Sequence, residues 1–71
     1  MAKLPKAIEV VRVAQKLGFL FSRQKGSHAI YRHEDGRRIT VSVHGRKEIS
    51  PAVFRQILKD LGISGEEFWR M

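Results

Sequence analysis

The chain has 71 residues, with 14 lysines and arginines against 7 aspartates and glutamates, and a formal net charge of +7 at pH 7. A chain of this length buries only about 60% of its unfolded surface, so we expect one small core in a single domain over residues 1–71. The absence of cysteine excludes disulfides and cysteine-bound zinc, and no apolar run reaches the ~18 residues of a membrane span. These features predict a cytoplasmic protein with an anionic partner.

The first periodic segment runs from about Pro5 to Leu17 and predicts a helix. Most of its apolar residues share one side of a helical wheel: Leu4, Ala7, Val10, Val11, Ala14 and Leu17. Pro5 suits the first turn, and Gly18 suits a left-handed stop after the helix. We expect this helix to be well buried.

Two strands are expected next. Residues 19–24 predict a strand with Phe19 and Phe21 facing inward, and Lys25–Gly26 predicts a tight turn. A second strand is expected over residues 27–33.

The dipeptide Asp35–Gly36 then marks a hairpin, which leads to the third and most regular strand. On this strand one face carries Ile39, Val41 and Val43, and the other carries Arg38, Thr40, Ser42 and His44. One-sided alternation of this kind predicts an antiparallel sheet with one covered face and one open face.

Ser50–Pro51 supplies an N-cap and a first-turn proline for a second helix. Its apolar face is formed by Phe54, Ile57, Leu58 and Leu61. Gly62 ends it, and Ser64–Glu67 forms a capping box for a last turn with Phe68 and Trp69. The element order α-β-β-β-α predicts a two-layer α+β fold, a three-stranded antiparallel sheet with two helices on one face.

The sequence offers little for metal or cofactor chemistry. It contains no glycine-rich phosphate loop. The carboxylate pairs Glu34–Asp35 and Glu66–Glu67 fit a turn and a helix start, and the spacing of His28, His33 and His44 matches no common ligand pattern. We therefore expect no metal and no cofactor.

Histidine exchanges protons near neutral pH without a cofactor, and RNA supplies its own nucleophile, the 2′-hydroxyl. His28 follows Gly26 and Ser27 at the start of the second predicted strand, with Lys25 and Arg32 close in sequence. The glycine lets a phosphate approach the backbone, and the serine and the cations offer donors. Strand parity groups His28 with Arg32 but does not fix which face they occupy.

A series of short motifs runs through the chain: Gly26-Ser27-His28, Tyr31-Arg32-His33, Gly36-Arg37, Thr40-Val41, His44, Leu58-Lys59-Asp60-Leu61-Gly62-Ile63-Ser64 and Glu66-Glu67-Phe68. In this order and spacing they resemble the HicA family of toxins from bacterial and archaeal toxin–antitoxin pairs. The resemblance extends from about Pro5 to Phe68. One departure is Ser42, where family members often carry proline, and this puts the end of the third strand in doubt.

The resemblance implies a double-stranded-RNA-binding-like fold and a ribonuclease that cleaves mRNA to block translation. It also implies a HicB-type antitoxin as partner, and it places the catalytic histidine at His28. The residues that we expect to bind RNA are Lys25, Ser27, Arg32, Arg37 and Arg46. Arg38 and Lys47 belong to the same cluster of cations around the hairpin and the following loop.

Other interpretations remain open from the sequence. The same fold and charge fit a non-catalytic module that binds structured RNA by shape, or a protein whose basic face only meets an acidic partner. A basic surface kept for solubility is the simplest alternative. Whether His33 or His44 assists His28 is not decided by the sequence.

Overall fold

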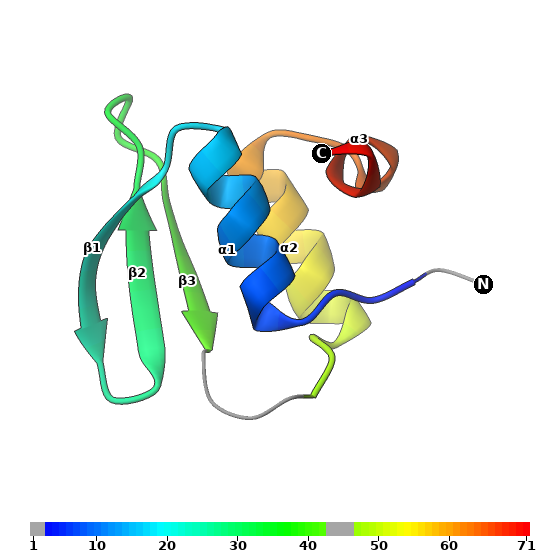
Figure 1. The fold of residues 1–71 in the computed structure, drawn as a ribbon, viewed down its shortest axis with the longest axis horizontal. Helices are drawn as coiled ribbons and strands as arrows, with labels where there is room; N and C mark the ends of the chain where they lie inside the picture. The colour runs from blue at the N-terminus through cyan, green and yellow to red at the C-terminus, as the bar shows by residue number, and fades with distance from the viewer. Residues whose placement is uncertain (1–2, 43–46) are drawn as a thin grey trace.

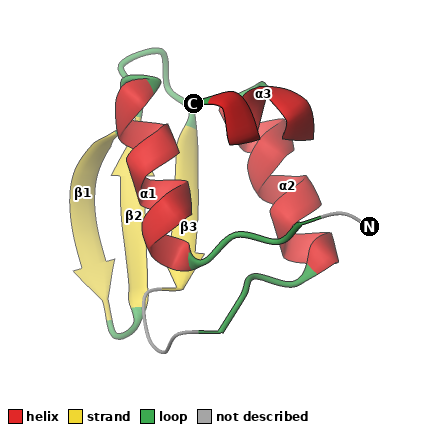
Figure 2. Ribbon diagram, turned by 45° about the vertical axis from the view of Figure 1, so that its right-hand side comes forward, coloured by secondary structure: helices red, strands yellow, loops and turns green. Residues whose placement is uncertain are grey.

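The computed structural model describes residues 3–42 and 47–71 (Figure 1). Its elements are α1 (Ala7–Lys16), β1 (Leu20–Lys25), β2 (His28–Arg32), β3 (Arg38–Ser42), α2 (Pro51–Leu61) and α3 (Gly65–Arg70). The strands form an antiparallel sheet in the order β1-β2-β3, and the two long helices lie side by side against one face (Figure 2). The predicted two-layer α+β fold is confirmed.

Alternation along the strands separates the two faces of the sheet. The buried strand residues are Ala29, Tyr31, Ile39 and Val41. Their neighbours in sequence on β2 and β3 are exposed or half-buried. The helices therefore cover one face, and the other face is open to solvent.

The core fills the space between the sheet and the helices. Its buried apolar side chains form one cluster: Val10, Val13, Ala14, Phe19, Ala29, Tyr31, Ile39, Val41, Phe54, Ile57, Leu61 and Phe68. The Phe68 ring of α3 lies edge-on to Phe54 and to Trp69, each at 5.0 Å between ring centres. A capping box holds this short helix, because Ser64 and Glu67 exchange hydrogen bonds of 2.9 and 3.1 Å.

Helix α1 begins two residues later than the sequence predicts. Pro5 lies before it in an extended segment, where its carbonyl accepts the N–H of Ile49 at 2.8 Å. The N–H of Lys6 donates to the Glu9 carboxylate at 3.0 Å, so this glutamate caps the first turn. The start of α1 is thereby tied to the segment that leads into α2.

Phe21 faces the helix side of the sheet, as expected, but it is not part of the core. Phe19 is fully buried, whereas Phe21 is 55% exposed. Phe21 is the cross-strand partner of Tyr31, and their rings meet edge-on at 5.7 Å. Because β1 is an edge strand and the helices pack mainly against β3, this end of the covered face stays partly open.

Candidate active site and nucleic-acid interface

An irregularity in β1 decides which of its side chains reach the open face. Arg23, rather than Ser22, is the partner of Ile30, so one extra residue is inserted after Phe21. Such a bulge reverses the facing of every residue that follows it on the strand. Arg23 and Lys25 therefore lie on the face opposite to Phe21.

Nine strand residues form what we call the open face, in three rows that run across the strands. The rows are Lys25, His28 and Ser42; Arg23, Ile30 and Thr40; and Leu20, Arg32 and Arg38. Neighbouring rows are two residues apart along β2, or about 7 Å. The face is thus a flat array of side chains that extends over the full length of β2.

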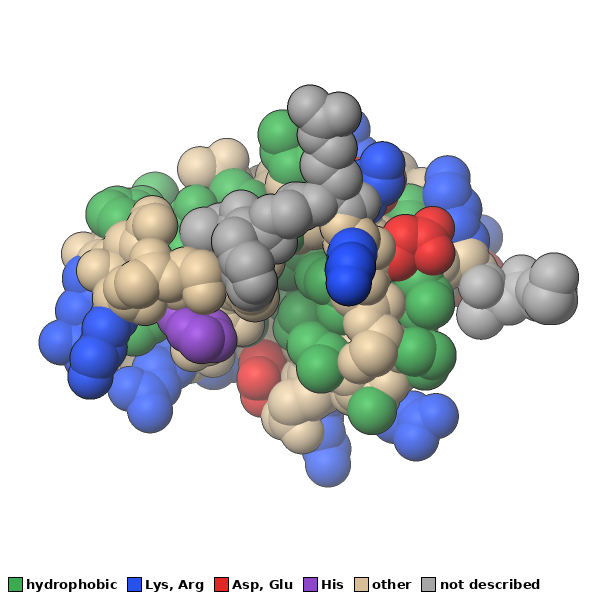
Figure 3. Space-filling model, turned by 90° about the horizontal axis from the view of Figure 1, so that it is seen from below, with side chains coloured by type: hydrophobic (Ala, Val, Ile, Leu, Met, Phe, Trp, Pro, Cys, Tyr) green, Lys and Arg blue, Asp and Glu red, His purple; other side chains and the backbone are tan. Residues whose placement is uncertain are grey.

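The charge of the open face is entirely positive. Its cations are Arg23, Lys25, Arg32 and Arg38, and none of its nine residues is acidic. Figure 3, seen from the end that carries the β1–β2 turn, shows Lys and Arg side chains gathered beside a histidine on this side of the molecule. Asp60 of α2 lines a shallow groove together with Arg38 and Thr40, but four cations with no acid among the nine residues still favour a polyanionic ligand.

His28 opens β2 and is exposed, with Lys25 and Ser42 as its cross-strand partners. Over residues 3–42 and 47–71, no side chain forms a hydrogen bond or ion pair with its imidazole. Both ring nitrogens are therefore available to a ligand that approaches from solvent. An exposed imidazole beside an ammonium group can move a proton next to a bound phosphate.

The turn before His28 consists of Gly26 and Ser27, one residue later than predicted. Gly26 has a φ of +59°, and its carbonyl accepts a hydrogen bond from the Gln24 side-chain amide at 3.0 Å. No atom beyond its chain neighbours lies within 4 Å of the position that a Cβ would occupy. Backbone conformation, and not lack of space, therefore requires glycine here.

We expect Gly26→Ala to lower the free energy of unfolding by about 1–2 kcal/mol, because an L side chain is strained in the left-handed region. Gly26→Asn should lower the free energy of unfolding by less, since asparagine tolerates the left-handed conformation. Urea denaturation of the three proteins measures the difference. An alanine variant as stable as the parent would show that the turn does not hold this φ in solution.

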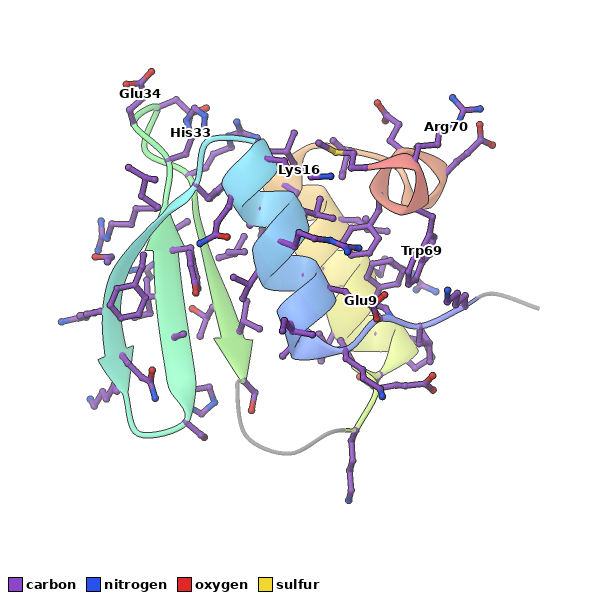
Figure 4. All side chains as sticks on the ribbon, viewed as in Figure 1. Glu9, Lys16, His33, Glu34, Trp69 and Arg70 are labelled. Carbon is purple, nitrogen blue, oxygen red and sulfur yellow. The ribbon has the colours of Figure 1, made fainter. Side chains whose placement is uncertain are left out.

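His33 lies at the other end of the sheet, beside the β2–β3 hairpin that carries Glu34 (Figure 4). The N–H of Asp35 lies 3.1 Å from its Nδ1, and its ring packs edge-on against Phe19 at 5.2 Å. Oδ1 of Asp35 approaches the same nitrogen at 3.0 Å and forms an ion pair only when the ring is protonated. Five residue steps, or about 16 Å, separate His33 from His28 along the strand.

Arg37 lies in the same hairpin, away from the open face. Its guanidinium donates to the Leu61 carbonyl at the end of α2 and to the Asp35 carboxylate, each at 2.8 Å. It also stacks over the Phe19 ring at 5.2 Å. The arginine satisfies a carbonyl at the helix C-terminus and joins the hairpin to the helix layer.

These contacts lower the pKa of Asp35. The N–H of Arg37 donates to its carboxylate, the Arg37 side chain adds a hydrogen bond and charge, and His33 adds a smaller contribution. A carboxyl group with a lowered pKa stabilises the fold above its unfolded pKa of ~4, and this stability is lost as the pH falls through the folded value.

We therefore expect Asp35→Asn to unfold at a lower temperature than the parent at neutral pH. The difference should shrink as the pH falls below ~4, because the parent carboxyl then takes up its proton. Melting curves of both proteins from neutral pH to below pH ~4 measure how the difference in melting temperature changes. A difference that stays constant with pH would show that the charge of Asp35 does not act.

The structure brings four of the expected site residues together. Lys25 and His28 share a row, Ser27 lies between them in the turn, and Arg32 lies on the same face. Arg37 is directed elsewhere. Arg46 and His44 lie outside the described residues. Arg23 also belongs to the open face, and its place depends on the bulge, for which the sequence gives no signal.

Within residues 3–42 and 47–71, no three His, Asp or Glu side chains gather as metal ligands. No described helix is both long and apolar enough to cross a membrane. The family profile described as HicA toxin of bacterial toxin-antitoxin matches residues 7–63, which include both long helices and all three strands. Comparison with curated proteins gives no significant match.

Proposed function

The chain belongs to the HicA family of bacterial toxins, and we propose that it is an endoribonuclease that cleaves mRNA without a metal ion. His28 is the catalytic residue of this proposal. Lys25 and Ser27 bind the RNA beside it, and Arg32 binds the RNA farther along the same face. The single observation that carries the proposal is the exposed His28 imidazole on an acid-free basic face, with Lys25 beside it in the same row.

The chemistry follows from what RNA and one imidazole provide. The 2′-hydroxyl attacks the adjacent phosphorus, the bond to the 5′-oxygen of the next nucleotide breaks, and a 2′,3′-cyclic phosphate forms. One proton leaves the 2′-oxygen and one reaches the 5′-oxygen. His28 transfers one of these protons, and water exchanges the other. A positioned proton-transfer group contributes roughly 10²–10⁴-fold to the rate.

The cations of the open face supply the second part of catalysis. Negative charge builds on the phosphate oxygens in the transition state, and fixed positive groups stabilise it. Lys25 is the nearest cation to His28 in the sheet register. We expect Arg37 to contribute least to RNA binding among the expected residues, because its guanidinium already donates hydrogen bonds to Asp35 and Leu61.

The partner of this toxin is, in our proposal, an antitoxin of the HicB type. Such a protein neutralises the toxin most simply by covering the open face with acidic residues, because complementary charge speeds association and excludes RNA. A neighbouring reading frame for a small acidic protein, whose co-expression restores growth, is the expected genetic observation. A chain that is harmless when expressed alone would contradict the toxin role.

The direct test is incubation of the purified protein with labelled mRNA in the presence of EDTA. We expect fragments that end in a cyclic phosphate, and protection of the RNA when the antitoxin is added in equal amount. RNA that is bound with a steep salt dependence but never cut would contradict the nuclease. The chain would then be an RNA-binding module of the same fold.

A further inference from the structure

Arg32 and Arg38 form an unusual pair at the far end of the open face. They are direct cross-strand partners on β2 and β3, and both are exposed. Among the described residues neither forms an ion pair or a side-chain hydrogen bond. Like charges directly opposite each other destabilise a sheet, so the fold keeps a charge repulsion here that a bound anion would relieve.

Two arginines elsewhere in the described residues have acidic partners. Arg37 pairs with Asp35 at 2.8 Å, and Arg70 pairs with Glu66 at 2.8 Å. These arginines have acidic partners within four residues, as is common on protein surfaces. Arg12, Arg23 and Arg55 also form no ion pair among the described residues, so what distinguishes Arg32 and Arg38 is their direct pairing across two neighbouring strands.

The pair is connected to His28 by a continuous series of donors. Four residue steps, or about 13 Å, separate the row of His28 from the row of Arg32. The middle row lies between them and offers the Arg23 guanidinium and the Thr40 hydroxyl. Apart from His28 itself, none of the nine open-face residues carries a ring, so the face between His28 and the arginine pair presents donors for phosphate and hydroxyl groups rather than rings for base stacking.

We propose that Arg32 and Arg38 bind an RNA phosphate several nucleotides away from the cleaved bond, so that the RNA strand lies along β2. A stacked strand carries one charge per ~3.4 Å, so the distance of about 13 Å corresponds to about four nucleotides, and to fewer in an extended strand. This proposal rests on the nuclease function for the position of the cleaved bond. The binding of RNA along the face does not depend on cleavage.

Binding tests the proposal without cleavage. The protein is the His28→Ala variant, and the ligands are labelled single-stranded RNAs that range from a dinucleotide to a dodecanucleotide. We expect R32Q/R38Q on this background to weaken binding of the long RNAs roughly tenfold near 0.15 M salt, and to reduce the salt slope by about 0.7, the value for one phosphate contact on a single strand. Binding of the dinucleotide should hardly change, because it does not reach the pair.

The matched control is R12Q/R55Q, which removes two exposed arginines from α1 and α2 on the covered side of the sheet. It changes net charge equally and should leave the length dependence intact. The proposal is overturned if the control pair causes the same loss, or if R32Q/R38Q weakens all lengths equally. Melting temperatures verify folding, and R32Q/R38Q should unfold no earlier than its background, since a repulsion is removed.

Cleavage then separates this proposal from the nuclease function. If the parent cuts RNA, R32Q/R38Q should lower kcat/KM for long RNAs toward the value for short ones. If the parent never cuts but the length-dependent loss of binding is observed, the nuclease fails and the phosphate site stands. If the parent cuts and the length dependence is unaffected, the phosphate site fails and the nuclease stands.

Discussion

His28→Ala is expected to reduce RNA cleavage roughly 10²–10⁴-fold, the contribution of one positioned proton-transfer group. Folding should be unaffected, because the side chain is exposed and forms no hydrogen bond or ion pair with the described part of the chain. Most RNA affinity should remain, since the phosphate contacts come from the cations. Initial rates in EDTA, melting temperature and binding, measured on one preparation of each protein, give the three results.

His33→Ala is the matched control for this experiment, because it removes the same kind of side chain from a position just beyond the other end of β2. Loss of its edge-on contact with Phe19 should lower stability by about 0.5–1.5 kcal/mol while cleavage persists. Full cleavage activity in a folded His28→Ala protein would show that His28 is not the catalytic residue. Equal loss of activity in both variants would point to a contaminating nuclease or to damage to the fold.

The order of the elements is predictable from the sequence because the apolar patterns are one-sided. Ile39 and Val41 alternate with polar residues, and this places the third strand between a core and solvent. Ser50 and Gly62 mark the ends of α2, where the structure shows a side-chain cap and a left-handed residue. Local signals of this kind need no knowledge of the rest of the fold.

The facing of β1 is not predictable in the same way. The alternation that begins at Phe19 and Phe21 would place Arg23 and Lys25 on the covered face. The bulge at Ser22 reverses this arrangement. No glycine or proline marks the bulge in the sequence, and pairing with β2 decides it. The basic character of the open face is therefore a result of the tertiary structure.

Arg37 illustrates a second limit. In sequence it is one cation among several around the hairpin. In the structure its guanidinium donates a hydrogen bond to the Leu61 carbonyl and stacks over the Phe19 ring, because the fold brings the end of α2 to this turn. Charge composition predicts the kind of ligand, whereas tertiary contacts decide which cations are free to bind it.

Phe19→Ala should have the largest effect on stability, a loss of about 3–5 kcal/mol, the usual cost of truncating a buried phenylalanine. Phe19 is fully buried and contacts both His33 and Arg37, so it joins the end of α1 to the β2–β3 hairpin. A chain of 71 residues has a total stability of about 4–10 kcal/mol. The variant should therefore be close to unfolding at room temperature, which urea denaturation measures.

Phe21→Ala is the control, with the same change two residues away on the same side of the chain. Its ring is half exposed and keeps one edge-on contact with Tyr31, so we expect a loss of about 1 kcal/mol. A loss as large as that of Phe19→Ala would contradict the exposed position of Phe21. If instead Phe19→Ala is as stable as Phe21→Ala, the hairpin does not depend on this ring. The contacts of His33 and Arg37 with the Phe19 ring would then contribute little to the stability of the fold.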